Sequence, residues 1–271
     1  MKSLLYVIAV FAAFWFVSVN FGLIASLVLA LVLIAFILWN KRITLITYFA
    51  SQAYFVKGDK EKAYNLYQSA YKSGFMTPGG KVSFGAFCLY TGNFDRCRRL
   101  LTSVVNSSRS AATDRTNAQH YLAILTWREG DLDGAIEQME TVHKETTSTG
   151  TYGTLGAFYV EKSKRDGCYH TYLDFLLEAY DYNDTDKTIC DNLGEIYLYL
   201  GEYVKAEEMY IKLFKTAQTS PVPHFHYALV QKGLGKTEEA KANLEKALAC
   251  NFARSLTVSR DMVKEELEKL K

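Results

Sequence analysis

The sequence predicts an all-α protein in three parts: an N-terminal two-helix transmembrane hairpin, an α-solenoid of about six helical pairs, and a C-terminal capping helix. Three observations predict this fold class. Residues 4–39 carry no charged side chain, turn glycines recur at intervals near 34 residues, and residues 258–271 place apolar side chains on one face of a charged helix.

The uncharged N-terminal stretch is too long for one straight membrane-spanning helix. Its 36 residues would extend about 54 Å at 1.5 Å per residue, whereas the hydrocarbon core of a bilayer is about 30 Å thick. Asn20, Phe21 and Gly22 form its turn-like interruption. We therefore predict two helices, residues 3–19 and 22–40, within a membrane domain of residues 1–42; a shallow re-entrant hairpin remains an alternative.

Two other interpretations of this stretch fit less well. A secretory signal peptide has an apolar region of about 7 to 15 residues that ends at a small-residue cleavage site, and here the apolar run continues well beyond that length. A buried hairpin of a soluble protein would need a polar face, and the stretch has none. An uncleaved hairpin of this kind is more typical of a bacterial than of a eukaryotic protein.

The flanking charges predict the orientation of the hairpin. Lys2 precedes it, Lys41 and Arg42 follow it, and the turn between its helices has no charge. Basic residues favour the cytoplasmic side, so both termini and the solenoid are expected in the cytoplasm, with two helices in the membrane. Trp39 is then expected at the level of the lipid headgroups.

Residues 187–220 show the repeating unit most clearly. They predict two short helices joined by a turn at Gly201, followed by a near restart at Pro221. The marker positions of the first helix are Cys190, Leu193, Gly194 and Tyr197, and those of the second are Ala206, Tyr210 and Leu213.

This pattern resembles the tetratricopeptide repeat. That family has an aromatic residue, Leu-Gly and Tyr in the first helix, small and aromatic positions in the second, and a period of about 34 residues. Here Cys190 replaces the leading Trp and Gln218 stands where Pro is usual. The resemblance implies a right-handed solenoid whose helical pairs stack through small residues at Ala63, Ala135, Ala206 and Ala240.

Turn glycines extend the register along the chain. Gly58 and Gly92 are 34 residues apart, as are Gly201 and Gly235. A polar loop at residues 106–110 and a charged insertion at residues 162–167 are expected to lengthen two of the units. The predicted solenoid covers residues 43–257, with repeats at about 44–77, 78–111, 116–149, 150–186, 187–220 and 221–254, and the capping helix covers residues 258–271.

The resemblance also implies where a partner binds. Members of this family usually bind a peptide or protein segment in the groove lined by the first helix of each repeat, and aromatic and Arg side chains are typical anchors of protein interfaces. A subclass holds a C-terminal carboxylate, but Gly233 stands where that clamp needs Lys, so this mode is not expected. The predicted groove residues are Tyr90, Tyr121, Trp127, Arg128, Asp191, Glu195, Tyr199 and His226.

Charge and cysteine usage exclude other classes. Lys and Arg number 31 against 29 Asp and Glu, so no global field attracts nucleic acid. The five cysteines, at 88, 97, 168, 190 and 250, contain no C-x-x-C pair. Reduced thiols are expected, which favours a cytosolic location for most of the chain.

No catalytic or cofactor motif is present, and neither cofactor nor metal is predicted. The sequence lacks a P-loop, G-x-G-x-x-G, H-E-x-x-H and G-x-S-x-G. His224 and His226 are two apart, and residues at that spacing do not share a helix face. Residues 181–186 lack the Gly and terminal Glu of a calcium loop.

The predicted function is a membrane-anchored, non-catalytic scaffold that binds a peptide or protein segment in its groove on the cytoplasmic side. The alternative is a structural subunit of a larger membrane complex, assembled through the hairpin. Gly22, Ala25, Ser26 and Ala30 offer a small-residue face for such helix packing. An enzyme with an unrecognised site is a third, weaker hypothesis.

Overall fold

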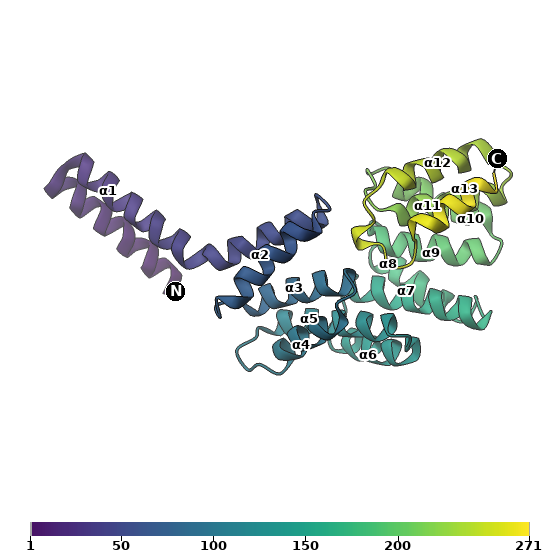
Figure 1. Ribbon diagram of the computed structural model, residues 1–271, viewed down its shortest axis with the longest axis horizontal. Coiled ribbons are helices and arrows are strands. Elements are labelled where there is room, and N and C mark those ends of the chain that lie inside the picture. The colour runs from purple at the N-terminus through teal and green to yellow at the C-terminus, as the bar shows by residue number, and fades with distance from the viewer. Residues whose placement is uncertain (1, 271) are drawn as a thin grey trace.

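The computed structural model is all-α (Figure 1). It describes the backbone of residues 2–270 and the side chains of residues 15, 16, 19, 20, 22, 24–39 and 41–270. Over this part of the chain there are thirteen α-helices, one 3₁₀ helix and no strand. The helices are α1 (Lys2–Phe55), α2 (Lys60–Lys72), α3 (Pro78–Tyr90), α4 (Phe94–Val105), α5 (Ala112–Arg128), α6 (Leu132–Glu145), α7 (Thr149–Asp166), α8 (Leu173–Tyr182), α9 (Lys187–Tyr199), α10 (Tyr203–Leu213), α11 (Pro221–Gly233), α12 (Thr237–Ala249), η1 (Phe252–Arg254) and α13 (Arg260–Glu268).

Helix α1 is a hairpin followed by a bend. Its helical backbone breaks at Gly22, with φ 81° and ψ 177°, and the two arms lie side by side away from the solenoid (Figure 1). The second arm bends by 58° between Ile24–Trp39 and Lys41–Phe55. The break lies in the predicted turn, and Lys41–Phe55 runs on from the hairpin into the solenoid without a linker.

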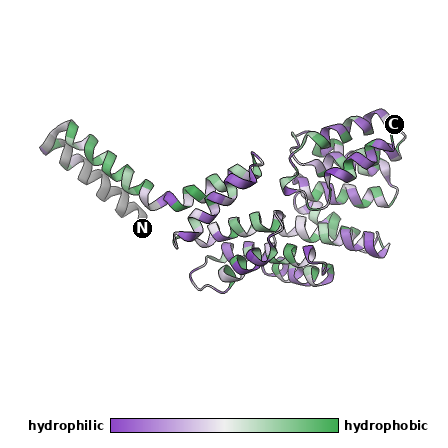
Figure 2. Ribbon diagram, viewed as in Figure 1, coloured by the Kyte–Doolittle hydropathy of each residue, from purple (hydrophilic) through white to green (hydrophobic). Residues whose placement is uncertain are grey.

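The predicted membrane helix of residues 3–19 lies largely outside the residues whose side chains the structure describes. Within the described part of the chain, no single helix is long and apolar enough to cross a bilayer, although the bent pair Ile24–Trp39 and Lys41–Phe55 is so when its two helices are taken together. The arm Ile24–Trp39 is nevertheless strongly apolar (Figure 2), and large side chains such as Leu31, Phe36 and Trp39 are more than half exposed on it.

The turns inside the helical pairs follow one local rule. Gly58, Gly92 and Gly130 have φ between 72° and 101°, a region that L side chains rarely adopt. The next residue then caps the second helix: in the first pair, the Asp59 carboxylate accepts a hydrogen bond from the Lys62 amide at 2.9 Å. A left-handed glycine followed by an N-cap residue thus turns the chain sharply between antiparallel helices.

Small residues set the distance between helices. The four predicted small positions, Ala63, Ala135, Ala206 and Ala240, are all fully buried. At Gly194, an added Cβ would lie 2.8 Å from the Tyr210 ring, so only glycine fits at this crossing. Each pair therefore covers the apolar face of its neighbour, which is how a solenoid builds a continuous core.

The charged insertion predicted at residues 162–167 lengthens its unit as expected, and it does so as helix. It forms the last turn of α7, which has 18 residues against 13 in α9 and α11 and is capped by Gly167 in the left-handed region. Ion pairs hold this turn: Lys162 Nζ lies 2.6 Å from Asp133 Oδ1, and Arg165 Nη1 lies 2.8 Å from Asp133 Oδ2. These charged side chains therefore lie on the solvent-facing end of α7 and contact the preceding helical pair.

The chain ends on a short amphipathic helix in the range predicted for the cap. Ser259 begins α13 by accepting a hydrogen bond from the Met262 amide at 3.2 Å. Val263 is fully buried against the last pair, whereas Asp261 and Lys264 remain exposed. The polar outer face separates the core from solvent at this end of the solenoid.

Candidate functional site

The concave face holds a cavity of about 530 Å³, hereafter the groove cavity. The first helices of successive pairs line it, chiefly α5, α7, α9 and α11, together with residues 254–257 that follow the last pair. None of its lining residues comes from a second helix, because the small residues of those helices face the core instead. The cavity is therefore formed by the face on which the sequence analysis placed a partner.

Six of the eight predicted groove residues line this cavity, and two do not. The six are Tyr90, Tyr121, Trp127, Asp191, Glu195 and His226. Arg128 instead donates from Nη1 to the Leu256 carbonyl at 3.1 Å. Tyr199 stacks on Tyr169, with ring centroids 5.5 Å apart, because it lies one helical turn beyond Glu195.

Aromatic side chains form one wall of the groove cavity. Tyr90, Tyr121 and Trp127 are half-buried there, and the Trp127 ring packs 5.7 Å from Phe158. Burial raises the pKa of both tyrosine hydroxyls, so they are neutral at physiological pH. This wall offers large apolar area with polar tips, a combination common at protein interfaces.

The opposite part of the cavity is a buried charge cluster. His226 Nδ1 lies 3.2 Å from Asp191 Oδ1, and His226 Nε2 lies 3.6 Å from Glu195 Oε1. Lys164 Nζ reaches the same Glu195 oxygen at 3.1 Å. Asp191 and Glu195 are one turn apart on α9, His226 comes from α11 and Lys164 from α7. Three neighbouring pairs therefore converge on this cluster.

The carboxylates keep the buried imidazole charged. Burial by itself lowers the pKa of His226, but the nearby Glu195 and Asp191 outweigh it and raise the pKa to about 9. Lys164 acts in the opposite direction on His226, while Glu195 and Glu161 raise its own pKa against the effect of burial. At neutral pH the cluster thus contains two cations that face carboxylates, the arrangement that buried charges require.

The same three acidic and imidazole groups could hold a metal ion. Ligand atoms of Asp191, Glu195 and His226 all lie within 4.8 Å of one another. However, each ring nitrogen faces a different carboxylate, and an imidazole offers only one nitrogen to a given metal. The geometry is that of an imidazolium bridging two carboxylates. His224 has a different partner, Asn243 Oδ1 at 3.2 Å, so the two histidines do not act together.

Sequence reasoning did not predict the contacts of His120 and Asn192, which line the groove cavity, or of Lys164 beside it. His120 Nε2 lies 2.6 Å from Thr154 Oγ1, and burial lowers the pKa of His120 to about 4. Asn192 donates to the Gly153 carbonyl at 2.8 Å, so its amide is already used inside the solenoid. Lys164 was assigned to the charged insertion. No motif marks these residues, because their partners lie on neighbouring pairs.

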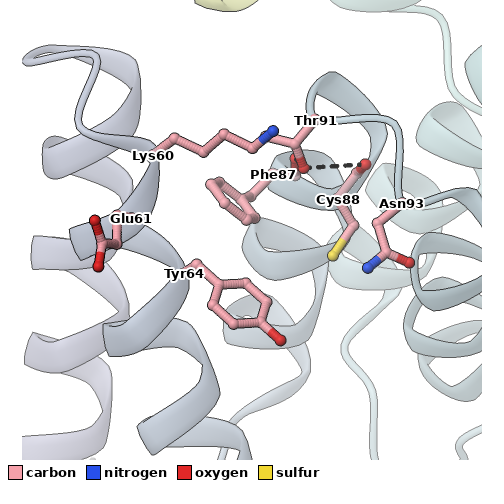
Figure 3. A pocket seen from close by; sticks show the side chains of 7 residues that line it. All are labelled: Lys60, Glu61, Tyr64, Phe87, Cys88, Thr91 and Asn93. Atoms are coloured by element: carbon pink, nitrogen blue, oxygen red, sulfur yellow. Dashed lines mark hydrogen bonds between the residues drawn. The ribbon is translucent and has the colours of Figure 1, made fainter.

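A second pocket lies between α2 and α3, and its lining residues form no catalytic arrangement (Figure 3). Its volume is about 430 Å³. The Tyr64 and Phe87 rings flank it and the Cys88 sulfur points towards it (Figure 3). Burial raises the pKa of the Cys88 thiol to about 12, which leaves it protonated and a poor nucleophile. Thr91 is held by the carbonyls of Phe87 and Cys88.

Comparison with known proteins supports the fold. The tetratricopeptide repeat family model matches residues 188–219 and 223–251, which cover the α9/α10 and α11/α12 pairs. A comparison with curated proteins finds no match. The match identifies these two pairs as tetratricopeptide repeats and agrees with the predicted all-α solenoid.

Two solved structures illustrate the likeness. TTC0263, a thermophilic tetratricopeptide repeat protein of Thermus thermophilus, is 20% identical over 72% of this chain and 98% of its own, with a TM-score of 0.57. The human IFIT1 dimer with m7Gppp-AAAA is 19% identical over 84% of this chain and 53% of its own, with a TM-score of 0.62. At such identities the likeness concerns the fold alone.

Proposed function

From a solenoid in which two pairs match the tetratricopeptide repeat, we propose a non-catalytic scaffold that binds a polypeptide segment in the groove cavity. The observation that carries this proposal is the lining of that cavity. That lining contains both an aromatic wall with Tyr121 and Trp127 and a buried charge cluster around Glu195 and His226. An extended segment laid along first helices would meet apolar anchoring area and polar groups of both signs, which together give affinity and register.

We further propose that the hairpin anchors this scaffold in a membrane, with the solenoid on the cytoplasmic side. Large apolar side chains cover the arm Ile24–Trp39 and are exposed, and a contiguous apolar surface of this kind needs a cover. Arg42 lies 4.2 Å over the Trp39 ring at the end of that arm, an arrangement suited to the interface between headgroups and water. Lys41 and Arg42 favour the cytoplasmic side for the solenoid.

The alternative, a subunit of a membrane complex, uses the same arm in another way. Ser26 is almost fully buried and Ala25 and Ala30 are half-buried, so the small-residue face is already covered within the hairpin. The face left for other transmembrane helices is the one with large residues, such as Leu27 and Leu31. Large residues on this face would select a partner helix less specifically than a face of small residues would.

Crosslinking and capture of the full-length protein from its native membranes tests the groove. Trp127→Ala removes the largest aromatic side chain of the wall, and Tyr199→Ala is the matched control because Tyr199 lies outside the cavity. We expect Trp127→Ala to weaken the binding of a captured partner by about 2 kcal/mol, the scale of an interface anchor. Tyr199→Ala should leave the partner bound.

A thermal melt of both variants checks that each remains folded, since Trp127 also packs on Phe158. A partner that both variants retain would refute the groove and shift the interaction to the hairpin or the convex face. A partner lost from a hairpin-replaced variant, but not from Trp127→Ala, would favour the membrane-complex alternative.

A further inference from the structure

The two ends of the solenoid present different surfaces. At the C-terminal end, α13 covers the last helical pair and exposes charged side chains such as Asp261 and Lys264. At the other end, the first helix of the solenoid is Lys41–Phe55, which continues from the hairpin arm through the 58° bend. We call Lys41–Phe55 the entry segment. A solenoid end that meets water is normally polar, so the outer side of the entry segment is the place to look for a cover.

The entry segment buries one side and exposes apolar residues on the opposite side. Ile43 and Ala50 are buried in the core of the first pairs. With 3.6 residues per turn, Leu45, Tyr48 and Phe49 project away from that core. Tyr48 and Phe49 are each 56% exposed and Leu45 is 37% exposed. The Tyr48 and Phe49 rings also contact each other, with centroids 5.6 Å apart. We call these three residues the outer face.

The bend turns the outer face towards the side on which the hairpin lies. In Figure 1 the hairpin leaves the entry segment on one side, and α2, α3 and the rest of the solenoid lie on the other. Because the buried side of the entry segment packs against the solenoid core, its exposed side points the opposite way. With the arm along the bilayer normal, the 58° bend brings the entry segment closer to the bilayer plane than to its normal. A tilt of about 20°, which is common for membrane helices, can bring it closer still.

The residues around the outer face are those found at the boundary between acyl chains and water. Trp39 lies at the end of the arm, and the Arg42 guanidinium lies 4.2 Å over its ring. Tyr48 adds a second amphipathic ring of the kind enriched at headgroup level. Lys41 is exposed at the start of the entry segment, and basic residues here attract anionic headgroups. The exposed Thr44 makes this side mixed in polarity, which suits the headgroup region better than the hydrocarbon core.

We propose that Leu45, Tyr48 and Phe49 form a second membrane-contact surface, which lies in the headgroup region of the bilayer beside the hairpin. This inference rests on the proposed membrane anchor, because the hairpin brings the outer face to the lipid. The first helical pair then rests on the membrane surface. The bilayer covers this end of the solenoid as α13 covers the other end.

The reactivity of an introduced thiol tests this contact. Full-length protein carrying Tyr48→Cys is placed in nanodiscs of phosphatidylcholine and phosphatidylglycerol, one copy in each disc, and treated with a membrane-impermeant maleimide. Tyr182→Cys is the matched control, since Tyr182 is 51% exposed and lies on α8, far from the hairpin (Figure 1). Mass spectrometry of peptides gives the rate at each site relative to the native, exposed Cys168. If lipid covers the outer face about nine-tenths of the time, Tyr48→Cys reacts about tenfold more slowly than Tyr182→Cys.

The outcomes separate the outer face from the hairpin. Phe49→Cys should be protected as Tyr48→Cys is, because both side chains belong to the outer face. Equal rates for Tyr48→Cys and Tyr182→Cys in protein held by the discs would overturn the inference and leave the membrane anchor intact. Protection that appears only in discs with two copies would identify a second copy of the chain as the cover, and would also overturn it. Protein that does not enter the discs would overturn the inference and the membrane anchor together.

Discussion

The buried imidazolium predicts how stability depends on pH. His226 is enclosed by Asp191 and Glu195 from α9, and these carboxylates raise its pKa from 6.5 to about 9. A group whose pKa is raised on folding stabilises the native state below its unfolded pKa and loses that contribution as pH rises through the folded value. The window of loss therefore runs from about pH 6.5 to above pH 9.

The size of the His226 pKa shift sets the size of its contribution to stability. One pKa unit corresponds to about 1.4 kcal/mol, so the full contribution is about 3 kcal/mol at acidic pH. From pH 7 to pH 9.5, the part lost is about 2 kcal/mol by the same linkage. This is large beside the total stability of a typical domain, so denaturant unfolding can resolve it.

The assay compares wild type with His226→Gln by urea unfolding at pH 7 and pH 9.5. The wild type should lose about 2 kcal/mol more than the variant over this interval. His224→Gln is the matched control on the same helix. Burial lowers the pKa of His224, so this imidazole is neutral between pH 7 and pH 9.5. Its replacement should therefore leave the pH dependence of the unfolding free energy unchanged. Parallel pH profiles for wild type and His226→Gln would refute the charged bridge.

Two predictions test the packing of the solenoid. Gly194→Ala would place a Cβ 2.8 Å from the buried Tyr210 ring. The overpacking should cost about 1 to 3 kcal/mol, against a helix-propensity gain of about 1 kcal/mol. Gly150→Ala is the control, because a Cβ there has no heavy atom nearer than 3.9 Å, and it should not destabilise the protein in the same thermal melt. Ala206→Phe fills a fully buried helix crossing and should lower the unfolding free energy by at least about 1 to 3 kcal/mol, so an unchanged melt would show that the repeat register is wrong.

The helical pairs were predictable because their signals are local. A turn glycine such as Gly58, a capping residue such as Asp59 and small positions such as Ala63 act within a few residues of one another. The charged residues 162–167 were expected to lengthen their unit, but local polarity did not indicate that they do so as an extra helical turn. Their ion pairs with Asp133, about 30 residues away, let the helix continue.

The groove was predicted only in part, since its chemistry depends on residues far apart in sequence. Asp191, Glu195 and His226 were each assigned to the concave face, yet nothing in their spacing indicated that one imidazole bridges both carboxylates. Lys164 joins them from the segment that was predicted as a charged insertion. Residues 251–257 gave no signal at all, because the hydrogen bond from the Tyr54 hydroxyl to the Ala253 carbonyl joins positions 199 residues apart.

Helix α1 links the two proposals physically. Its segment Lys41–Phe55 continues from the exposed apolar arm through a 58° bend, and the same segment supplies Tyr54, whose hydroxyl donates to the Ala253 carbonyl beside the groove cavity. No flexible linker separates the apolar arm from this segment, so a hairpin seated in a bilayer would hold the groove at a set angle to the membrane surface.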